Sequence, residues 1–246
     1  MTSAPPLQAL ILAAGRGTRL GSSAGGPKCL LPIAGVPLLD RYLAVLGRLG
    51  IPTTIVTGYA APVIDAHLTR VRSQFQVTCR TVVNPAFTSG SIVSLACGLQ
   101  AVEGPLLLLD GDVCFAPPVL ERLIASPRAN ALLVDIGTDF SDEEYMTGIV
   151  DGRVRALRRG PVPEYATRGE WVGFARLDSE AVAALRRAIT AQIDAGATQG
   201  GYEDALASLL EVTAMHVIDV ADQAWVEIDF SRDVARAESL VAEGRL

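Results

Sequence analysis

Glycines and cations gather near the start of the chain in a pattern suited to phosphate. Residues 7–28 read LQALILAAGRGTRLGSSAGGPK, so an apolar run ends in a glycine-rich turn that is followed by Arg19 and Lys28. Gly15 and Gly17 can adopt positive φ and carry no Cβ, so backbone N–H groups there can converge on an anion. Arg19 and Lys28 add full positive charge and directed donors. We therefore predict a strand that opens into a phosphate-binding loop; a strand-to-helix turn with two solvated cations is the alternative.

Two aspartates stand at positions where a metal ion would find oxygen ligands. Asp112 follows the apolar run 105–109, and a carboxylate at the end of a buried strand is costly unless it meets a cation or a donor. A metal would supply the cation, although capping of the next helix by Asp110 or Asp112 explains the Asp-Gly-Asp spacing equally well. Asp229 precedes a final helical stretch, where capping is the better interpretation from position alone. The residues alone thus leave a metal site and two helix caps as alternatives.

The composition favours a globular protein and argues against several other classes. Half of the 246 residues are hydrophobic, 20% are charged and the net charge is −6, which disfavours both disorder and nucleic-acid binding. The four cysteines contain no Cys-x-x-Cys pair, so neither a zinc cluster nor a disulfide framework is indicated. The first apolar run lacks a basic flank and is too short for a signal peptide or a membrane span. We expect a soluble, cytoplasmic protein without membrane insertion.

Strand and helix patterns alternate along the first half of the chain. Four strand-helix steps in series predict an α/β fold with a doubly wound, mostly parallel central sheet, Rossmann-like in class. Beyond residue 136 the strands become short and polar, and Asp151-Gly152 predicts an antiparallel hairpin. We expect a single domain over residues 1–246, with a small antiparallel lid or acceptor-binding insertion at about 138–212. Ser231 is expected to cap the last helix.

The expected elements have the following bounds. Helices are predicted over residues 38–49, 63–71, 91–102, 117–124, 182–193, 202–210 and from 231 onward. After the first strand, further strands are predicted over residues 51–57, 75–83, 105–109, 131–136, 145–150, 153–157, 170–177 and 214–220.

The first loop resembles the signature of a known enzyme superfamily. It lacks the Gly-Lys-Ser/Thr of a Walker loop and the third glycine of a dinucleotide fingerprint. The pattern LAAGxGxRL followed by PK is instead similar to that of the nucleotidyltransferases that activate sugars and small phosphorylated alcohols. The resemblance implies that Arg19 and Lys28 are catalytic, neutralising the phosphates of a nucleoside triphosphate. It also implies a loop that wraps this nucleotide, made of Leu12, Ala13, Ala14, Gly15, Gly17, Thr18 and Arg19.

Two further segments carry the resemblance to the metal ligands. The segment DVCFAPPVLERL is similar to a strand-end pattern of the molybdenum-cofactor branch, and it places Asp112, rather than Asp110, at the magnesium position. The segment WVEIDFSRDVARA is similar to the ending of the phosphocholine cytidylyltransferase branch, in which the aspartate matching Asp229 is the other magnesium ligand. Mg²⁺ usually takes one or two protein carboxylates together with substrate phosphates. With the resemblance, we favour Mg²⁺ ligation over helix capping for both residues.

A segment between these motifs resembles the base-recognition segment of the superfamily. It reads NPAFTSGSIVSLACGL, and Asn84, Ser89, Gly90 and Ser91 would offer short polar groups and amides at a helix start to a base edge or a ribose. Taken alone, Asn-Pro and Ser-Gly are ordinary turn formers. The single Ser/Gly turn is closer to the molybdenum-cofactor branch, so the base stays open: CTP is preferred, with GTP and UTP as alternatives.

Aromatic residues beside carboxylates mark a candidate acceptor site. We predict that Tyr145, Trp171, Tyr202 and Glu203 bind the acceptor, since such groups could surround a substituted ammonium by cation–π attraction. The segment GYEDAL is similar to the aromatic-acidic segment of the choline-phosphate branch. Burial in the core of the lid is an equally good interpretation for Trp171 and Tyr202.

The resemblance implies a magnesium-dependent cytidylyltransferase. CMP would pass from CTP to a phosphorylated or phosphonylated small molecule such as phosphocholine or 2-aminoethylphosphonate, with release of pyrophosphate. The residues show no nucleophile elbow, so direct in-line transfer is the simpler mechanism. A sugar-1-phosphate or molybdenum-cofactor nucleotidyltransferase is the first alternative, and a non-catalytic nucleotide-binding regulatory domain the second. We expect a monomer or a homodimer.

Overall fold

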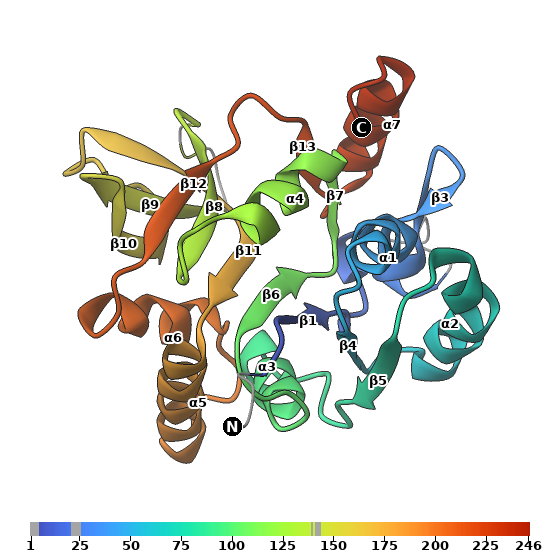
Figure 1. Cartoon of the computed structure of the whole chain (residues 1–246), viewed down its shortest axis with the longest axis horizontal. Coiled ribbons are helices and arrows are strands. Elements are labelled where there is room, and N and C mark those ends of the chain that lie inside the picture. The colour runs from blue at the N-terminus through green and yellow to red at the C-terminus, as the bar shows by residue number, and fades with distance from the viewer. Residues whose placement is uncertain (1–4, 21–25, 139, 141–143) are drawn as a thin grey trace.

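A computed structural model describes residues 5–20, 26–138, 140 and 144–246 of the chain. The middle of the predicted phosphate loop, residues 21–25, lies outside the described residues, as do residues 139 and 141–143 of the predicted insertion. The described strands include a nine-stranded sheet in the order β5-β4-β1-β6-β11-β8-β12-β10-β9 (Figure 1). The chain is therefore a mixed α/β protein with a central sheet, as predicted.

The first half of the chain builds the parallel part of this sheet. Its four strands are β1 (Gln8–Leu12), β4 (Thr53–Thr57), β5 (Cys79–Val83) and β6 (Leu106–Asp110). Both β1 and β6 are near-continuous apolar runs, which is typical of parallel strands that are covered on both faces. Leu12 is in register with Asp110. This register places the start of the glycine loop directly beside the Asp-Gly-Asp turn.

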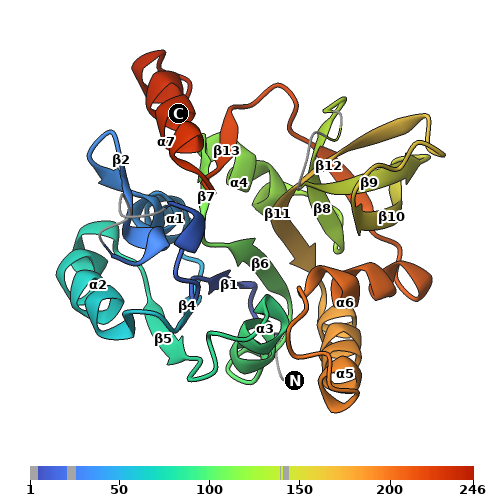
Figure 2. The ribbon, with the colours of Figure 1, turned by 180° about the vertical axis from the view of Figure 1, so that it is seen from behind.

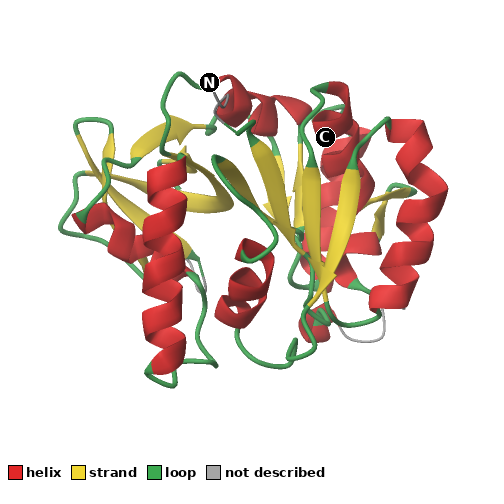
Figure 3. Cartoon of the chain, turned by 60° about the horizontal axis from the view of Figure 1, so that its bottom comes forward, coloured by secondary structure: helices red, strands yellow, loops and turns green. Residues whose placement is uncertain are grey.

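Helices cover both faces of the parallel part (Figure 3). Successive side chains of a strand point to opposite faces, and accordingly Ile11 packs in one hydrophobic cluster and Leu10 in another. The first cluster is completed by α1 (Leu38–Arg48), α2 (Ala61–Phe75) and α4 (Pro117–Ala125). The second is completed by α3 (Ser91–Leu99), α5 (Ser179–Asp194) and α6 (Glu203–Ser208), with the 3₁₀ turn Leu209–Glu211 behind it.

The predicted antiparallel strands join the central sheet rather than forming a separate one. The long strand β11 (Thr167–Leu177) lies between β6 and β8 (Ala131–Ile136) and is antiparallel to both. It also pairs with β9 (Tyr145–Val150). With β10 (Arg153–Arg159) and β12 (His216–Asp219), the strands from β8 to β12 therefore close into a ring of pairings. This ring lies at the side of the molecule away from α2 (Figures 1 and 2).

Short elements near the C-terminus bring distant parts of the chain together. β13 (Trp225–Glu227) pairs antiparallel with β7 (Val113–Phe115), and β2 (Pro32–Ile33) pairs with β3 (Val36–Pro37). The last helix, α7 (Ser231–Ala242), follows β13 directly. No helix in the described part of the chain is long and apolar enough to cross a membrane.

The start of α7 differs from the prediction. Ser231 is the first helical residue, so its expected role as the cap is wrong. The carboxylate of Asp233 instead reaches back and accepts hydrogen bonds from the amides of Asp229 and Phe230, at 2.9 and 2.7 Å. An acidic side chain in the first turn satisfies exposed amides and also favours the positive end of the helix dipole.

Candidate active site

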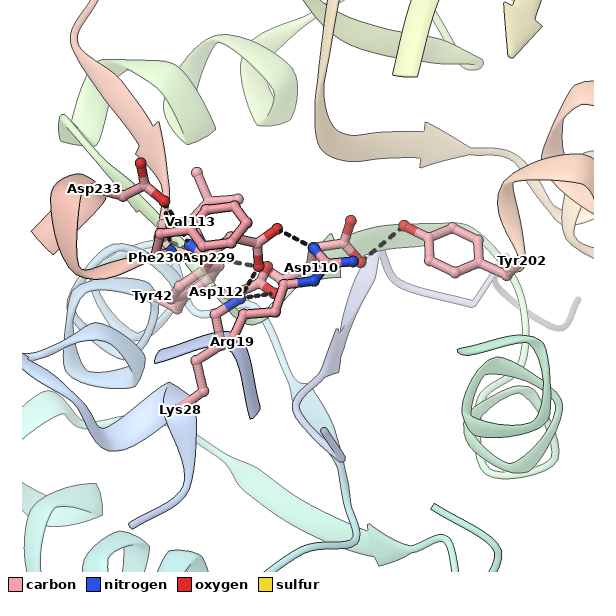
Figure 4. Close-up of polar contacts among 10 residues, drawn as sticks. All are labelled: Arg19, Lys28, Tyr42, Asp110, Asp112, Val113, Tyr202, Asp229, Phe230 and Asp233. Atoms are coloured by element: carbon pink, nitrogen blue, oxygen red, sulfur yellow. Dashed lines mark hydrogen bonds and ion pairs between the residues drawn. The ribbon is translucent and has the colours of Figure 1, made fainter. Parts of the chain in front are cut away.

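Two cations and two carboxylates from distant parts of the chain meet at one edge of the sheet (Figure 4). Lys28 Nζ lies 2.9 Å from Asp112 Oδ2 and 2.6 Å from Asp229 Oδ1. Arg19 donates to Asp229 Oδ2 at 2.8 Å. The structure thus brings together all four residues that were predicted to bind phosphate or metal, although as many as 210 positions separate them in sequence.

Asp112 is held by the tight turn between β6 and β7. The amide of Gly111 donates to the Leu12 carbonyl at 3.0 Å, and a Cβ at Gly111 would lie only 2.6 Å from that oxygen. The buried Tyr42 hydroxyl donates to the Asp110 carbonyl at 2.6 Å and accepts from the Val113 amide at 3.0 Å. This tyrosine was not singled out in the sequence. It lies in the helix predicted over residues 38–49, and the partners of its hydroxyl are fixed only by the folded turn.

Asp229 is placed beside Asp112 by the pairing of β13 with β7. Glu227 is in register with Val113, and the Ile228 amide donates to the Asp112 carbonyl at 3.0 Å. Asp229 therefore leaves the end of β13 close to the turn that carries Asp112. Its helix-capping alternative does not apply, because Asp233 makes the capping hydrogen bonds.

Lys28 approaches the carboxylates from the far end of the glycine loop. It begins a 3₁₀ turn (Lys28–Leu30), and its stem packs so closely on Gly17 that a Cβ there would lie 3.0 Å from Lys28 Cβ. Gly17 has a φ of +66°, as predicted, whereas Gly15 does not adopt positive φ. Lys28 is also the only lysine in the sequence.

Opposite charges change the proton affinity of these groups. Burial lowers the pKa of the Lys28 amine, but Asp112 and Asp229 raise it by more, so it lies above its ordinary value. Burial raises the pKa of Asp229, but Lys28 and Arg19 lower it by more, so it lies below its ordinary value. Both groups are therefore charged at neutral pH. Lys28 and Asp229 therefore form a charged pair at this edge of the sheet.

The carboxylates at this site fit a divalent cation. Asp112, Glu227 and Asp229 each offer an oxygen, and these oxygens lie within 4.8 Å of one another. Asp112 Oδ1 is buried and has no hydrogen-bond partner among the described residues, so it retains a lone pair for a ligand. Oxygen donors from carboxylates are those that Mg²⁺ prefers. Glu227 was missed in the sequence, although its position two residues before Asp229 is the spacing that puts two side chains on one side of a strand.

The first residues of the predicted nucleotide loop extend from β1. Leu12 ends that strand, Ala13 donates to the Val56 carbonyl at 2.9 Å, and Ala13 and Ala14 are buried. Thr18 begins a single 3₁₀ turn over residues 18–20 that places the Arg19 side chain toward Asp229. Arg19 lines the main cavity of the molecule, which has a volume of about 640 Å³.

The predicted base-recognition segment divides into a buried part and a part at the cavity. Asn84 is buried, donates to Ser94 Oγ at 3.0 Å and accepts from the Ala86 amide at 2.9 Å. It therefore holds the turn in which Ser89 donates to the Ala86 carbonyl. Gly90 and Ser91 line the cavity at the start of α3.

Three of the four predicted acceptor residues line the same cavity. Tyr145, Trp171 and Glu203 are in its wall, and the Tyr145 and Trp171 rings meet edge to face at a centroid distance of 6.5 Å. Tyr202 is buried and does not line the cavity. Its ring packs on Trp171 at 5.9 Å, and its hydroxyl donates to Asp110 Oδ1 at 2.8 Å. Of the two interpretations offered for Tyr202, the structure thus favours a buried position.

Two glutamates with raised pKa values line the acceptor side of the cavity, together with Arg159. Glu203 Oε2 is buried without a hydrogen-bond partner among the described residues, and burial raises the pKa of this carboxyl to about 7. Burial, together with Glu144 and Asp135, also raises the pKa of Glu170 to about 7. Glu170 was not singled out in the sequence, because it reaches the cavity only through the pairing of β11 with β8 and β9.

Comparison with known proteins gives a family match over most of the chain. Residues 9–212 match the family described as the MobA-like NTP transferase domain. The chain is 29% identical to the CMP-5'-(3-aminopropyl)phosphonate synthase of Streptomyces rubellomurinus, over 96% of this chain and 39% of that protein. It is 36% identical to the bifunctional protein GlmU of Syntrophotalea carbinolica, over 63% of this chain and 31% of that protein. The chain thus spans less than half the length of these curated relatives.

Solved structures share the fold at lower identity. The CTP:phosphocholine cytidylyltransferase from Streptococcus pneumoniae superimposes with a TM-score of 0.76 at 19% identity, over 96% of this chain and 99% of that chain. The inositol-1-phosphate CTP transferase from T. maritima gives a TM-score of 0.75 at 21% identity, over 97% of both chains. These matches confirm the predicted fold class, and the family match confirms the predicted resemblance to nucleotidyltransferases.

Proposed function

Because the chain belongs to the family of MobA-like NTP transferase domains, we propose that it is a nucleotidyltransferase and that it moves CMP from CTP onto a small phosphorylated or phosphonylated acceptor. One observation carries the proposal: Arg19 and Lys28 converge on Asp112 and Asp229 at the edge of a large cavity. Cations that can take up phosphates and carboxylates that can hold a divalent metal are the groups required for transfer between phosphates.

The choice of CTP and of this acceptor class rests on relatives and on the cavity wall. The curated relative from Streptomyces is named as a CMP-aminopropylphosphonate synthase, and two solved structures of the same fold are named as CTP-using transferases. The wall formed by Tyr145, Trp171 and Glu203 offers ring faces and a carboxylate, which suit a cationic group on the acceptor. An aminoalkylphosphonate or phosphocholine would present a phosphorus group at one end and a cation at the other.

In the proposed reaction an acceptor oxygen forms a bond to the α-phosphorus of CTP while the bond from that phosphorus to the β-phosphate oxygen breaks. Pyrophosphate leaves with the bonding electrons. Phosphate and phosphonate oxygens carry negative charge near neutral pH, so the residues need not remove a proton. Arg19 and Lys28 offset charge on the triphosphate, and the glycine loop orients it. Mg²⁺, held by Asp112 and Asp229 with Glu227 beside them, would supply Lewis-acid polarisation of the α-phosphoryl group.

A second acceptor class is supported by other matches. Two solved structures of the same fold have sugar substrates in their names: a Bacillus anthracis protein named as a glucose-1-phosphate thymidylyltransferase, with a TM-score of 0.78 at 17% identity, and a UDP-glucose pyrophosphorylase, with a TM-score of 0.75 at 15% identity. The acidic, aromatic wall favours a cationic acceptor over a neutral sugar, since Glu203 and Glu170 offer negative charge on the acceptor side.

The test is pyrophosphate release from each of the four nucleoside triphosphates in the presence of Mg²⁺. The acceptor panel contains phosphocholine, 2-aminoethylphosphonate, 3-aminopropylphosphonate, inositol phosphate, sugar 1-phosphates and molybdopterin. We expect CTP with one of the amine-bearing acceptors to give the highest kcat/KM. A preference for a sugar 1-phosphate would replace the proposed acceptor class, and nucleotide binding without turnover on any acceptor would contradict the proposal.

A further inference from the structure

Tyr202 connects three parts of the site although its side chain does not line the cavity. Its hydroxyl donates to Asp110 Oδ1 at 2.8 Å, and its amide donates to Ser91 Oγ at 3.1 Å. Its ring packs edge to face on Trp171. Figure 4 shows the hydroxyl approaching Asp110 from the side away from Arg19 and Lys28. Tyr202 is thus hydrogen-bonded to Asp110 at the end of β6 and to Ser91 at the start of α3, and it packs on Trp171 in the acceptor wall.

The residues before Tyr202 are also hydrogen-bonded to the turn at the start of α3. The Gly90 amide donates to the Thr198 carbonyl at 2.8 Å. The two segments lie so close that a Cβ at Gly90 would be 2.0 Å from the Gly200 carbonyl oxygen. Glu203, which follows Tyr202, is therefore carried by a segment whose position is set by the start of α3.

Asp110, which accepts the hydrogen bond from the Tyr202 hydroxyl, is held in place by contacts of its own. It ends β6 two residues before Asp112, and its carbonyl accepts from the buried Tyr42 hydroxyl. Opposite it, Gly173 adopts a φ of +87° within β11, and a Cβ at Gly173 would lie 2.7 Å from Asp110 Oδ2. The backbone of β11 thus leaves space for the Asp110 carboxyl, and Tyr202 supplies its hydrogen bond.

We propose that Tyr202 is a positioning residue, which through Asp110 sets the distance between the acceptor wall and the metal-binding turn. The inference rests on the proposed function, because it concerns how the acceptor oxygen is aligned with the α-phosphorus. Transfer between two bound substrates is steeply sensitive to alignment, and a misplacement of about 1 Å can cost about 100-fold in rate. The Tyr202 hydroxyl contacts neither substrate in this scheme, so its loss changes alignment more than binding.

The test is Tyr202→Phe, which keeps the ring and removes only the hydroxyl. We expect kcat to fall about 10- to 100-fold, with the KM values for CTP and acceptor within about threefold of wild type. Binding of CTP measured by calorimetry should be unchanged, since the amide bond to Ser91 remains. A kcat equal to that of wild type would overturn the inference, and so would an increase confined to the acceptor KM, which would return Tyr202 to acceptor binding.

A further variant separates positioning from loss of structure. Thr147→Val removes another buried hydroxyl, which donates to the Gly169 carbonyl at 2.9 Å outside the cavity wall. We expect this variant to lower the melting temperature as Tyr202→Phe does while kcat stays unchanged. If Thr147→Val lowered kcat as much, the effect of Tyr202 would be structural and the inference would be overturned.

A double-mutant cycle tests whether the effect passes through Asp110. With Asp110→Ala, which removes the acceptor of this hydrogen bond, the effects of the two substitutions on kcat should be clearly less than multiplicative, because both break the same hydrogen bond. Multiplicative effects would overturn the route through Asp110. The assays use the acceptor that wild type turns over in the panel above. If wild type turns over none, the proposed function fails, whereas failure of this inference requires an active wild type.

Discussion

Two regions at the cavity differ in how their carboxylates are paired. One, the metal end, contains Asp112 and Asp229, and the other, the acceptor end, contains Glu203. At the metal end, Lys28 lies within 3 Å of both Asp112 and Asp229, so the protein itself balances the carboxylates. At the acceptor end, the Glu203 carboxyl has a buried oxygen without a hydrogen-bond partner among the described residues. The two aspartates thus face a cation of the protein, although Asp112 Oδ1 has no hydrogen-bond partner among the described residues. The acceptor end holds negative charge that a cationic ligand would neutralise.

Physical costs explain why these two arrangements have different consequences. Removing one member of a buried ion pair leaves the other charge uncompensated, which is strongly destabilising. Neutralising a carboxylate whose burial outweighs its hydrogen bond and its attraction to a nearby cation, as at Glu203, removes a cost instead. Substitutions at the metal end should therefore lower both stability and turnover. Substitutions at the acceptor end should lower turnover but raise stability.

The largest effect is expected at the metal end. Asp112→Ala and Asp229→Ala should each raise the reaction barrier by several kcal/mol, or lower turnover about 10³-fold, because each removes an oxygen that would hold Mg²⁺. The measurement is pyrophosphate release in Mg²⁺, with circular dichroism to check that each variant is folded. Asp222→Asn, an exposed aspartate paired with Arg122, serves as the control. Near-normal turnover in either variant would remove that residue from the metal site.

A smaller effect should show that Lys28 and the metal compete for the same oxygens. In Lys28→Met the carboxylates lose their internal cation, so Mn²⁺, measured by calorimetry or electron paramagnetic resonance without nucleotide, should bind about tenfold more tightly, or by about 1.4 kcal/mol. Turnover should fall in the same variant because a phosphate-binding cation is lost. Arg48→Met, which removes an exposed cation paired with Glu121, should leave Mn²⁺ affinity unchanged. Unchanged affinity in Lys28→Met would mean that no such competition exists.

The uniqueness of Lys28 offers an independent measurement on the wild-type protein. Since it is the only lysine in the sequence, isotopic labelling of lysine side chains gives a nuclear magnetic resonance signal from this site alone. CTP and a divalent cation added together should shift that signal, as Lys28 exchanges carboxylates for phosphates. A Lys28 signal whose chemical shift does not change when both ligands are added would mean that Lys28 does not bind the nucleotide.

The sequence predicted the metal end better than the acceptor end, for reasons that lie in the contacts. Asp112 and the loop that carries Arg19 and Lys28 follow the neighbouring strands β6 and β1, so strand order brings them together, whereas Asp229 was predicted from the resemblance of its segment. Glu227 could have been found from its spacing to Asp229. These residues depend on local pattern and simple topology.

The acceptor end depends on contacts that no local pattern contains. The residue pattern of an antiparallel strand such as β11 does not indicate whether the strand lies in a separate lid or between β6 and β8. Tyr202 donates a hydrogen bond to Asp110, which is 92 positions away. The sequence therefore left acceptor binding and burial in the core as two interpretations of this tyrosine. The prediction of Tyr145, Trp171 and Glu203 as acceptor residues remains a prediction.

The smallest expected effect concerns stability at the acceptor end and depends on pH. The pKa of Glu203 is raised by burial from an ordinary value of 4.5 to about 7. Between these values the folded state binds more protons than the unfolded state, so stability falls as pH rises through this range. Above about pH 7 the folded protein carries the full cost of the ionised carboxylate. Glu203→Gln removes that cost because its side chain does not ionise.

We therefore expect the melting temperature of Glu203→Gln to exceed that of wild type at pH 8 by about 2 °C or more, and to match it near pH 4.5. The control is Glu238→Gln on the exposed face of α7, whose difference from wild type should not vary with pH. An amine-bearing acceptor such as 2-aminoethylphosphonate should stabilise wild type more than Glu203→Gln, since the ligand cation neutralises the carboxylate only when one is present. A difference between Glu203→Gln and wild type that is constant with pH, or equal stabilisation of both by the acceptor, would mean that the charge of Glu203 is balanced within the protein, and the contrast between the two ends of the cavity would disappear.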